Sequence, residues 1–562
     1  MSNRYKKLNH KKYVFVDVLF FCSTTLLIFL FETSYRTERR IGHDLVSYVL
    51  PAFAMDHNLG SPYSDYYINR PPGSFILIRL WAKMFGYELQ SWVILEFLLL
   101  LVISLILYEI FNCLVPKLTS AISVFFSLLT LLFSGTLAMF MPLELISIFL
   151  ILLATRILLK NRSSFKKTTI FFILLFFAAS VREQYLITLI FMFVSVLIAQ
   201  KNENQLFKTT QAYLLGLIIA GSAFWGHFLV HSNFADFVSV FKDEFNSEKQ
   251  PFSHYFGWIL DAISFHSVTS FSSLILIPEL HMYIFIAIFF SLLISALVHL
   301  SNRMYFSHTF QQFIVGMVGF SLIASVSWQS SGFRFSSHYA ISSLIGMFLC
   351  IISTVSFITH FLSFKFDLRK RWVYVPSALL LLFIPSVETV KLSAATFDKI
   401  SISTIANQFS RITSNQLSSN EIKAEEIIKL SPPDFNCSVN IYGWGSGSFY
   451  LNSKSRPCTK YFLPNLVATR QMAIEYMMEI ERNPPRVINY GCLDYLTCSD
   501  LDINEFETIV FPYAKVIAGC YFSIAQEHHQ STDSNYYRLF LSRYDSKIEQ
   551  SNCIKTTIGA SN

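Results

Sequence analysis

The segment Asp65–Gly73 reads D-Y-Y-I-N-R-P-P-G and stands between two strongly apolar stretches, 13–31 and 91–112. Pro71 and Pro72 cannot continue a helix from upstream, and they restrict the residue before them to an extended backbone. We therefore expect Arg70 to hold its guanidinium at a fixed place beside the next membrane segment. A long polar loop directly after an N-terminal hydrophobic helix is unusual for a transporter or a channel. It indicates a reaction held at a membrane surface.

Composition places the chain among polytopic α-helical membrane proteins. Of its 562 residues, 53% are hydrophobic and only 14% are charged, and the mean hydropathy is +0.45. Soluble proteins keep about a quarter of their residues charged. A bilayer core of roughly 30 Å needs about 20 apolar residues per helix, which predicts about eleven spans. These are 13–31, 91–112, 119–137, 142–158, 168–180, 184–199, 211–230, 281–299, 310–328, 338–358 and 373–391.

The positions of lysine and arginine predict the orientation. Basic clusters precede the first span, lie at 160–167 between the fourth and fifth spans, and lie at 365–371 between the tenth and eleventh. Such clusters mark the cytoplasmic side. The N-terminus is then cytoplasmic, and the loops 32–90 and 231–280 and everything after residue 391 are outside. The formal charge of +7 follows from this topology, and no basic stripe indicates a nucleic-acid partner.

The region 392–562 differs from the membrane-embedded region 1–391. It combines a polar helical stretch at 400–429 with strand-like runs at 439–442, 487–490 and 508–511, which predicts an extracytoplasmic soluble α/β domain. Six of the nine cysteines lie here, and an even number in an exported segment favours disulfides over buried free thiols. Six cysteines allow fifteen pairings. No pair has zinc-type spacing.

Two residues of the first outer loop suit a transfer reaction. Asp44 follows the first span closely, where a charged side chain needs a task or a partner. It can act as a general base toward an acceptor hydroxyl, or it can form an ion pair with Arg39 or Arg40. Arg70 suits a phosphate because of its planar fork of donors. The alternative for Arg70 is a side chain that reaches toward lipid headgroups.

Further ionisable residues fall on the same outer side. Each has a plain alternative, an interfacial anchor or, for Arg182 and Glu183, an ion pair between neighbours. Together with Asp44 and Arg70 they provide carboxylates for acid/base or metal chemistry and cations for a phosphate-bearing ligand. They are Asp65 in the first loop, Glu144 at the start of the fourth span, Arg182 and Glu183 between the fifth and sixth, and Arg334, His338 and Tyr339 at the tenth.

The first loop resembles that of GT-C fold glycosyltransferases. The elements that carry the resemblance are G-H-D-L at 42–45 and G-S-P-Y-S-D-Y-Y-I-N-R-P-P-G-S-F at 60–75. They look closest to the bacterial relatives of protein mannosyltransferases and aminoarabinose transferases. This resemblance implies a polyprenyl-phosphate sugar donor, an inverting transfer, and a site between the membrane domain and the outer loops. It also implies that Asp44 is the catalytic acidic residue, Asp65 the second loop carboxylate, and Arg70 the phosphate contact.

Two departures from that family pattern affect the chemistry. Arg70 stands where the family usually has lysine, and His43 stands where many members have a second acidic residue. No cofactor is assigned, and dependence on a divalent metal is left open.

The sequence thus predicts a multi-pass glycosyltransferase of the bacterial inner membrane. Its partners would be a polyprenyl-phosphate-linked sugar donor, membrane lipids, and an acceptor that is a glycan, a lipid or a protein. One rival is a non-catalytic transporter or flippase of lipid-linked glycans. It does not need the long first loop or the large outer domain, and the Gly/Pro-interrupted spans in matching halves that many carriers have are absent. The other rival, an enzyme of the O-antigen ligase type, should have its key residues in a large loop late in the chain.

Overall fold

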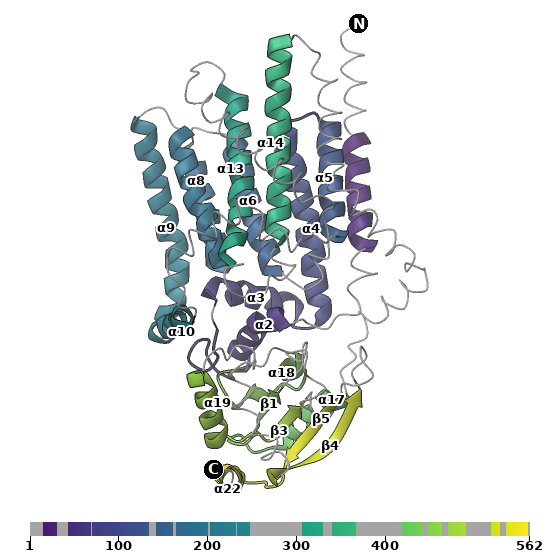
Figure 1. Ribbon diagram of the computed structural model, residues 1–562, viewed down its shortest axis with the longest axis vertical. Helices are drawn as coiled ribbons and strands as arrows, with labels where there is room; N and C mark the ends of the chain where they lie inside the picture. Colours follow the sequence, from purple (N-terminus) through teal and green to yellow (C-terminus); the bar gives the residue numbers. More distant parts are fainter. Residues whose placement is uncertain are drawn as a thin grey trace.

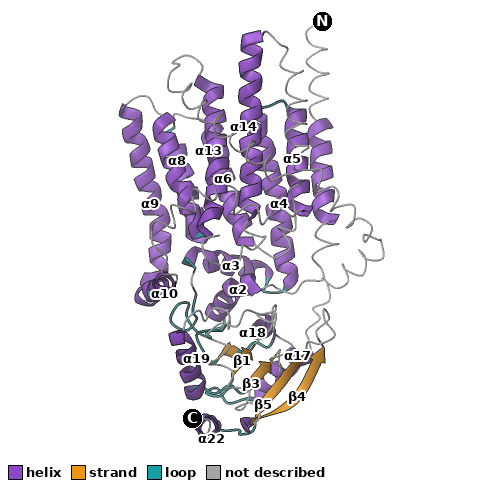
Figure 2. Ribbon diagram, viewed as in Figure 1, coloured by secondary structure: helices purple, strands orange, loops and turns teal. Residues whose placement is uncertain are grey.

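The computed structural model describes residues 15–30, 43–68, 70–133, 142–160, 164–199, 203–231, 233–247, 306–329, 340–366, 419–441, 448–462, 470–490, 519–528 and 536–559. Long helices run side by side along most of its length, and a smaller α/β region lies at the end of the molecule opposite the N-terminus (Figure 1). Helices and strands are coloured separately in Figure 2.

The bundle helices coincide with the predicted spans. They are Phe15–Leu30, α4 (Leu89–Asn112), α5 (Lys117–Phe133), α6 (Pro142–Lys160), α7 (Phe165–Val181), α8 (Leu186–Ala199), α9 (Glu203–His231), α13 (Phe306–Gln329) and α14 (Ala340–Phe366). In the described part of the chain, the stretches Gln90–Asn112, Pro142–Lys160 and Gln205–His231 are long and apolar enough to cross a membrane. The predicted spans 281–299 and 373–391 lie outside the described residues.

Small residues allow close helix packing inside the bundle. A Cβ added at Gly319 of α13 would lie 2.5 Å from the carbonyl oxygen of Gly346 in α14, and the reverse distance is also 2.5 Å. A shared contact between two glycines lets the backbones of two membrane helices approach directly. The pair α13 and α14 is therefore packed backbone to backbone at this point.

The segment 32–90, which the sequence predicts as the first outer loop, is more ordered in its described part than the sequence predicts. It contains two helices, α2 (His43–Asp56) and α3 (Pro72–Phe85), which lie between the bundle end and the C-terminal region (Figure 1). Most of the described side chains of α2 are buried, among them Leu45, Val49 and Leu50. The expectation of a long polar loop is therefore wrong for these two segments. The predicted loop 231–280 begins with helix α10 (Phe234–Ser247), and the rest of it lies outside the described residues.

The C-terminal region contains a mixed five-stranded sheet in the order β2-β1-β3-β5-β4. The strands are β1 (Cys437–Ile441), β2 (Arg456–Pro457), β3 (Val487–Tyr490), β4 (Tyr521–His528) and β5 (Tyr536–Ser542). The strand β1 is parallel to β2 and β3, whereas β5 is antiparallel to β3 and β4. The predicted strand at 508–511 lies outside the described residues.

Helices cover both faces of this sheet. Because successive strand side chains point to opposite faces, Val487 packs in one core with α17 (Ser419–Leu430) and α18 (Ser448–Asn452). Its neighbour Ile488 packs in a second core with α19 (Arg470–Arg482) and α22 (Lys547–Gly559). The region is an α/β sandwich, as predicted, and the proposed boundary at 391/392 lies outside the described residues.

Two disulfides join elements of this sandwich. Cys437 of β1 pairs with Cys458 just after β2, and Cys520 pairs with Cys553 of α22. The expected disulfides are thus present for four of the six cysteines, and Cys492 and Cys498 lie outside the described residues. Among the described cysteines, Cys22, Cys113 and Cys350 of the bundle are free thiols.

Candidate active site

The sequence Arg-Pro-Pro-Gly fixes the start of α3 against the end of α7. Pro71 is the extended N-cap residue, with φ −61° and ψ 151°, and Pro72 is the first helical residue, where a missing N–H costs nothing. A Cβ added at Gly73 would lie only 2.4 Å from the carbonyl oxygen of Ser180. Only glycine allows this approach, so the motif sets the position of α3 on α7.

Arg70 pairs across this junction with Glu183. Its Nη1 lies 2.6 Å from Glu183 Oε1, and the two side chains are 22% and 20% exposed. Glu183 begins the short 3-10 helix η1 (Glu183–Tyr185) between α7 and α8. Arg70, to which the sequence assigns a phosphate contact, is therefore held by a carboxylate in the turn between α7 and α8.

Arg182 belongs to a different, buried cluster. Its guanidinium contacts the carboxylate of Glu144 at the start of α6 and the hydroxyl of Tyr48 in α2, and the side chains of Arg182 and Glu144 are 2% and 1% exposed. Arg182 has an extended backbone, with φ −141° and ψ 113°, so it and Glu183 point to opposite sides. The alternative in which Arg182 and Glu183 pair with each other is therefore wrong.

Asp44 is the second residue of α2, one helical turn before Tyr48. The cluster of Arg182 and Glu144 thus holds the helix that carries Asp44. Asp65, in the loop between α2 and α3, is exposed, and its Oδ2 accepts a hydrogen bond of 2.7 Å from the backbone N–H of Ser61. In the chain, Asp44 stands at the N-terminal start of α2, and Asp65 follows the C-terminal end of that helix.

Tyr63 is a further residue of this loop that sequence reasoning missed. It is buried in the left-handed region at φ 68°, and its hydroxyl donates a hydrogen bond of 2.7 Å to the carbonyl of Arg70. Burial raises the pKa of Tyr63 well above its ordinary value, and the nearby Glu183 carboxylate adds to this effect. A strained backbone of this kind persists only where the surroundings enforce it. No sequence pattern pointed to it, because tyrosine rarely adopts this conformation.

A second missed group lies between α2 and α3. Asp56 accepts hydrogen bonds from Arg79 at 2.5 Å and from Tyr87 at 2.7 Å. Burial raises the pKa of the Asp56 carboxyl, but the hydrogen bonds from Tyr87 and Arg79 outweigh it and hold the pKa below its ordinary value. This group joins the end of α2 to the middle of α3.

Three of the predicted site residues lie outside the described residues: Arg334, His338 and Tyr339. Within the described ranges, no group of three histidine, cysteine, aspartate or glutamate side chains comes together as metal ligands.

Known proteins share parts of this sequence and this architecture. Residues 69–228 match the family model of dolichyl-phosphate-mannose-protein mannosyltransferases. The chain is similar to the crystal structure of ArnT from Cupriavidus metallidurans bound to undecaprenyl phosphate, with a TM-score of 0.51 and 10% identity, over 94% of this chain and 98% of that one. The archaeal oligosaccharyltransferase AglB from Archaeoglobus fulgidus gives a TM-score of 0.44 and 12% identity, over 94% and 74%. Among curated proteins, no sequence matches this chain significantly.

The family-model match and the ArnT structure confirm the resemblance that the first loop predicts. The chain has the GT-C fold of ArnT, a multi-span membrane fold followed by a C-terminal region with a small sheet. The matched stretch 69–228 begins one residue before Arg70 and includes Glu144, Arg182 and Glu183. The family match thus covers these four site residues, whereas Asp44 and Asp65 precede it.

Proposed function

We propose that this protein is an integral-membrane glycosyltransferase that moves a sugar from a polyprenyl-phosphate donor to an acceptor outside the cytoplasm. The mannosyltransferase family match and the fold shared with ArnT, a protein crystallised with undecaprenyl phosphate, support a lipid-phosphate donor. The acceptor is a cell-envelope glycan, a lipid or a protein.

The observation that carries this proposal is the placement of Arg70. Its backbone is fixed by Pro71, by the carbonyl contact with Tyr63 and by the close approach of Gly73 to α7. A guanidinium has five N–H donors in a fork that matches phosphate oxygens, so a contact with Glu183 is compatible with a phosphate contact. A cation at a helix start beside the bundle end is well placed for the phosphate of a membrane lipid.

The proposed reaction proceeds with inversion. Asp44 accepts the proton of the acceptor hydroxyl, and the resulting oxygen attacks the anomeric carbon of the donor sugar. The bond between that carbon and the phosphate oxygen breaks, and polyprenyl phosphate leaves with its electron pair. Arg70 and Arg334 stabilise the negative charge that develops on the leaving phosphate.

The remaining predicted residues have supporting roles in this proposal. The buried pair of Arg182 and Glu144 holds α2, and therefore Asp44, at the bundle end. Glu183 positions Arg70. Three further residues contact the substrates: Asp65, His338 and Tyr339.

We also propose the bacterial inner membrane as the location, with the N-terminus in the cytoplasm and a soluble domain, 392–562, outside, following the membrane domain 1–391. Lys160, Lys166 and Lys167 support this orientation, since they lie at the ends of α6 and α7 that are opposite the C-terminal region. The two disulfides support it as well, because such bonds persist in oxidising compartments.

The test is an assay with purified protein and a polyprenyl-phosphate sugar. We expect a glycoside and free polyprenyl phosphate in equal amounts. Mass spectrometry of the envelope glycans of a deletion strain should then reveal the one sugar that is missing. A protein that moves the lipid across liposomes and never forms a glycoside would instead be a transporter.

A further inference from the structure

The segment Arg456–Phe462 of the C-terminal region contacts the first loop directly. The backbone N–H of Tyr67 donates a hydrogen bond of 2.8 Å to the carbonyl of Lys460. The rings of Tyr67 and Tyr461 lie 5.3 Å apart, and those of Tyr66 and Phe462 lie 5.8 Å apart. All four aromatic side chains are buried. This contact reaches the loop only three residues before Arg70.

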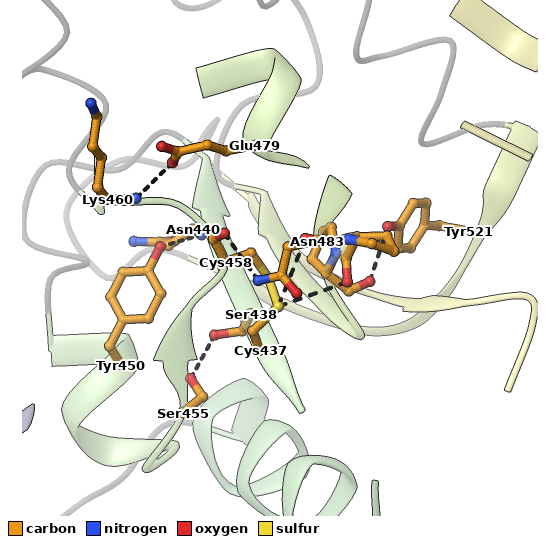
Figure 3. The surroundings of a disulfide bond; sticks show 12 residues. Cys437, Ser438, Asn440, Tyr450, Ser455, Cys458, Lys460, Glu479, Asn483 and Tyr521 are labelled. Carbon is orange, nitrogen blue, oxygen red and sulfur yellow. Dashed lines mark hydrogen bonds between the residues drawn. A yellow bond between two sulfur atoms is a disulfide. The ribbon is translucent and has the colours of Figure 1, made fainter. Parts of the chain in front are cut away.

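The same segment is fastened to the sheet on its other side. Cys458 forms a disulfide with Cys437 of β1, and its backbone N–H donates a hydrogen bond of 3.0 Å to the carbonyl of Ser438 (Figure 3). The side-chain amide of Asn483 donates a further hydrogen bond of 3.1 Å to the carbonyl of Cys458. The segment is therefore tied to the sheet by both covalent and hydrogen bonds.

Helix α19 braces the segment from a third direction. Glu479 accepts a hydrogen bond of 2.8 Å from the backbone N–H of Lys460 (Figure 3). Glu475, one turn earlier, accepts hydrogen bonds from Lys460 Nζ at 3.0 Å and from the Tyr461 hydroxyl at 2.8 Å. Two carboxylates of α19 thus fix the two residues that touch Tyr67.

We propose that Arg456–Phe462 is a positioning element for the first loop, with Tyr67 as the positioning residue and the Cys437–Cys458 disulfide as its fastening to the sheet. The C-terminal region then holds the segment that leads to Arg70 in one conformation. The positioning itself follows from the contacts, whereas its effect on donor use rests on the proposed function.

The chain offers a matched control in its second disulfide. Cys520 and Cys553 join the start of β4 to α22, and neither appears among the contacts that hold the first loop. The two disulfides close loops of similar length, with sequence separations of 21 and 33. Removing either one should therefore raise the entropy of the denatured chain by a similar amount. Only the Cys437–Cys458 bond should affect the loop.

The test is amide hydrogen exchange of residues 60–68 in the full-length protein in lipid nanodiscs. We expect exchange about tenfold faster in the double variant Cys437→Ser/Cys458→Ser and unchanged exchange in Cys520→Ser/Cys553→Ser. Tyr67→Ala, which leaves both disulfides intact, should also speed exchange, and Tyr67→Phe should restore the wild-type rate. Unchanged loop exchange in both Tyr67→Ala and the first disulfide variant would overturn the proposal, as would equal acceleration by both disulfide variants.

An activity readout separates this inference from the proposed function. In the transfer assay we expect Tyr67→Ala to raise the KM for the lipid donor about tenfold and to change kcat less than twofold, with Tyr67→Phe at wild-type values. A merely structural role would lower the active fraction, and therefore kcat, with KM unchanged, and that result contradicts the inference. If wild-type protein forms no glycoside but the exchange pattern holds, the proposed function fails and the positioning role stands.

Discussion

The Nη1 atom of Arg70 lies 2.6 Å from Oε1 of Glu183, which is 113 positions further along the chain. This ion pair joins the first outer loop to the turn between α7 and α8, at the place where Gly73 meets Ser180. It fixes one cation at the end of the membrane bundle without burying it, since both side chains keep about a fifth of their surface exposed. A cation in this position can still meet a lipid phosphate.

The proposed contact between Arg70 and the donor phosphate predicts that Arg70→Ala weakens donor binding. A charge-assisted hydrogen bond contributes about 1.5–3 kcal/mol, so donor affinity should fall roughly 10- to 100-fold. Arg70→Lys should be milder, because it keeps the charge. The control is Arg79→Ala, which lies in the following helix α3 and is paired with Asp56. Titration of polyprenyl-phosphate sugar in the transfer assay measures the effect, and wild-type affinity in Arg70→Ala would make Arg70 an interfacial anchor only.

The buried pair of Glu144 and Arg182 should dominate stability at the site. Removing one partner leaves an uncompensated buried charge, which costs about 3–5 kcal/mol. Glu144→Ala and Arg182→Ala should therefore each unfold at much lower temperature, and the double variant Glu144→Leu/Arg182→Met should recover part of the loss. Thermal unfolding in detergent is the measurement.

For comparison, Asp545→Ala removes a partner of Arg486 whose side chain is 94% exposed, and should cost less than about 1 kcal/mol. Equal losses of stability at the two sites would show that burial does not increase the contribution of the Glu144–Arg182 pair to stability.

Gly73→Ala tests the contact between α3 and α7. The added Cβ would meet the carbonyl oxygen of Ser180 at 2.4 Å, so the helices must separate, and overpacking of this kind costs about 1–3 kcal/mol. Gly226→Ala in α9 is the matched control, since an added Cβ there meets nothing within 4 Å. We expect Gly73→Ala to lower the unfolding temperature and to raise the donor KM, and Gly226→Ala to do neither. If Gly73→Ala changed neither the unfolding temperature nor the donor KM, the start of α3 would not determine the position of Arg70.

Two carboxylates of α19 should respond to pH with opposite signs. Burial raises the pKa of Glu479, so the folded state holds its proton more tightly and loses stability as pH rises through that raised pKa. Burial also raises the pKa of Glu475, but hydrogen bonds from Tyr461, Lys460 and Gln471 outweigh it and lower that pKa. The stability from Glu475 is therefore present at neutral pH and lost in acid.

Measured at pH 8, the unfolding temperature should rise in Glu479→Gln, whose amide oxygen still accepts the Lys460 N–H, and fall in Glu475→Gln. At pH 4 both differences should shrink. The same sign for both variants at pH 8 would contradict this account of the brace.

Much of the fold follows from local sequence. Apolar length predicts the spans, and Pro71 and Pro72 predict where the backbone near Arg70 is extended, because both effects depend on neighbouring residues only. Helix α2 is harder to predict, because a short apolar segment next to a span resembles an ordinary loop in sequence. Its order comes from packing on the bundle end and on α18.

The partners within the site could not be derived from one sequence. Arg182 and Glu183 are neighbours, so an ion pair between them was a natural alternative, but the extended backbone at Arg182 sends the two side chains apart. Glu144 and Tyr48 meet Arg182 only through the packing of α2, α6 and α7. Tyr63 and Tyr67 gave no signal either, because their roles depend on tertiary contacts with α10 and with Arg456–Phe462.

Transfer by Asp44→Asn tests the central claim most directly. This substitution keeps the size of the side chain and removes its basic oxygen. In a purified-protein assay with polyprenyl-phosphate sugar, with donor binding and glycoside formation measured separately, transfer should fall roughly 100-fold or more, the effect expected of a lost general base. Donor binding should stay at the wild-type level, because the proposed mechanism assigns the phosphate contact to Arg70 and not to Asp44. Glycoside formation at the wild-type rate in Asp44→Asn would contradict the proposed mechanism.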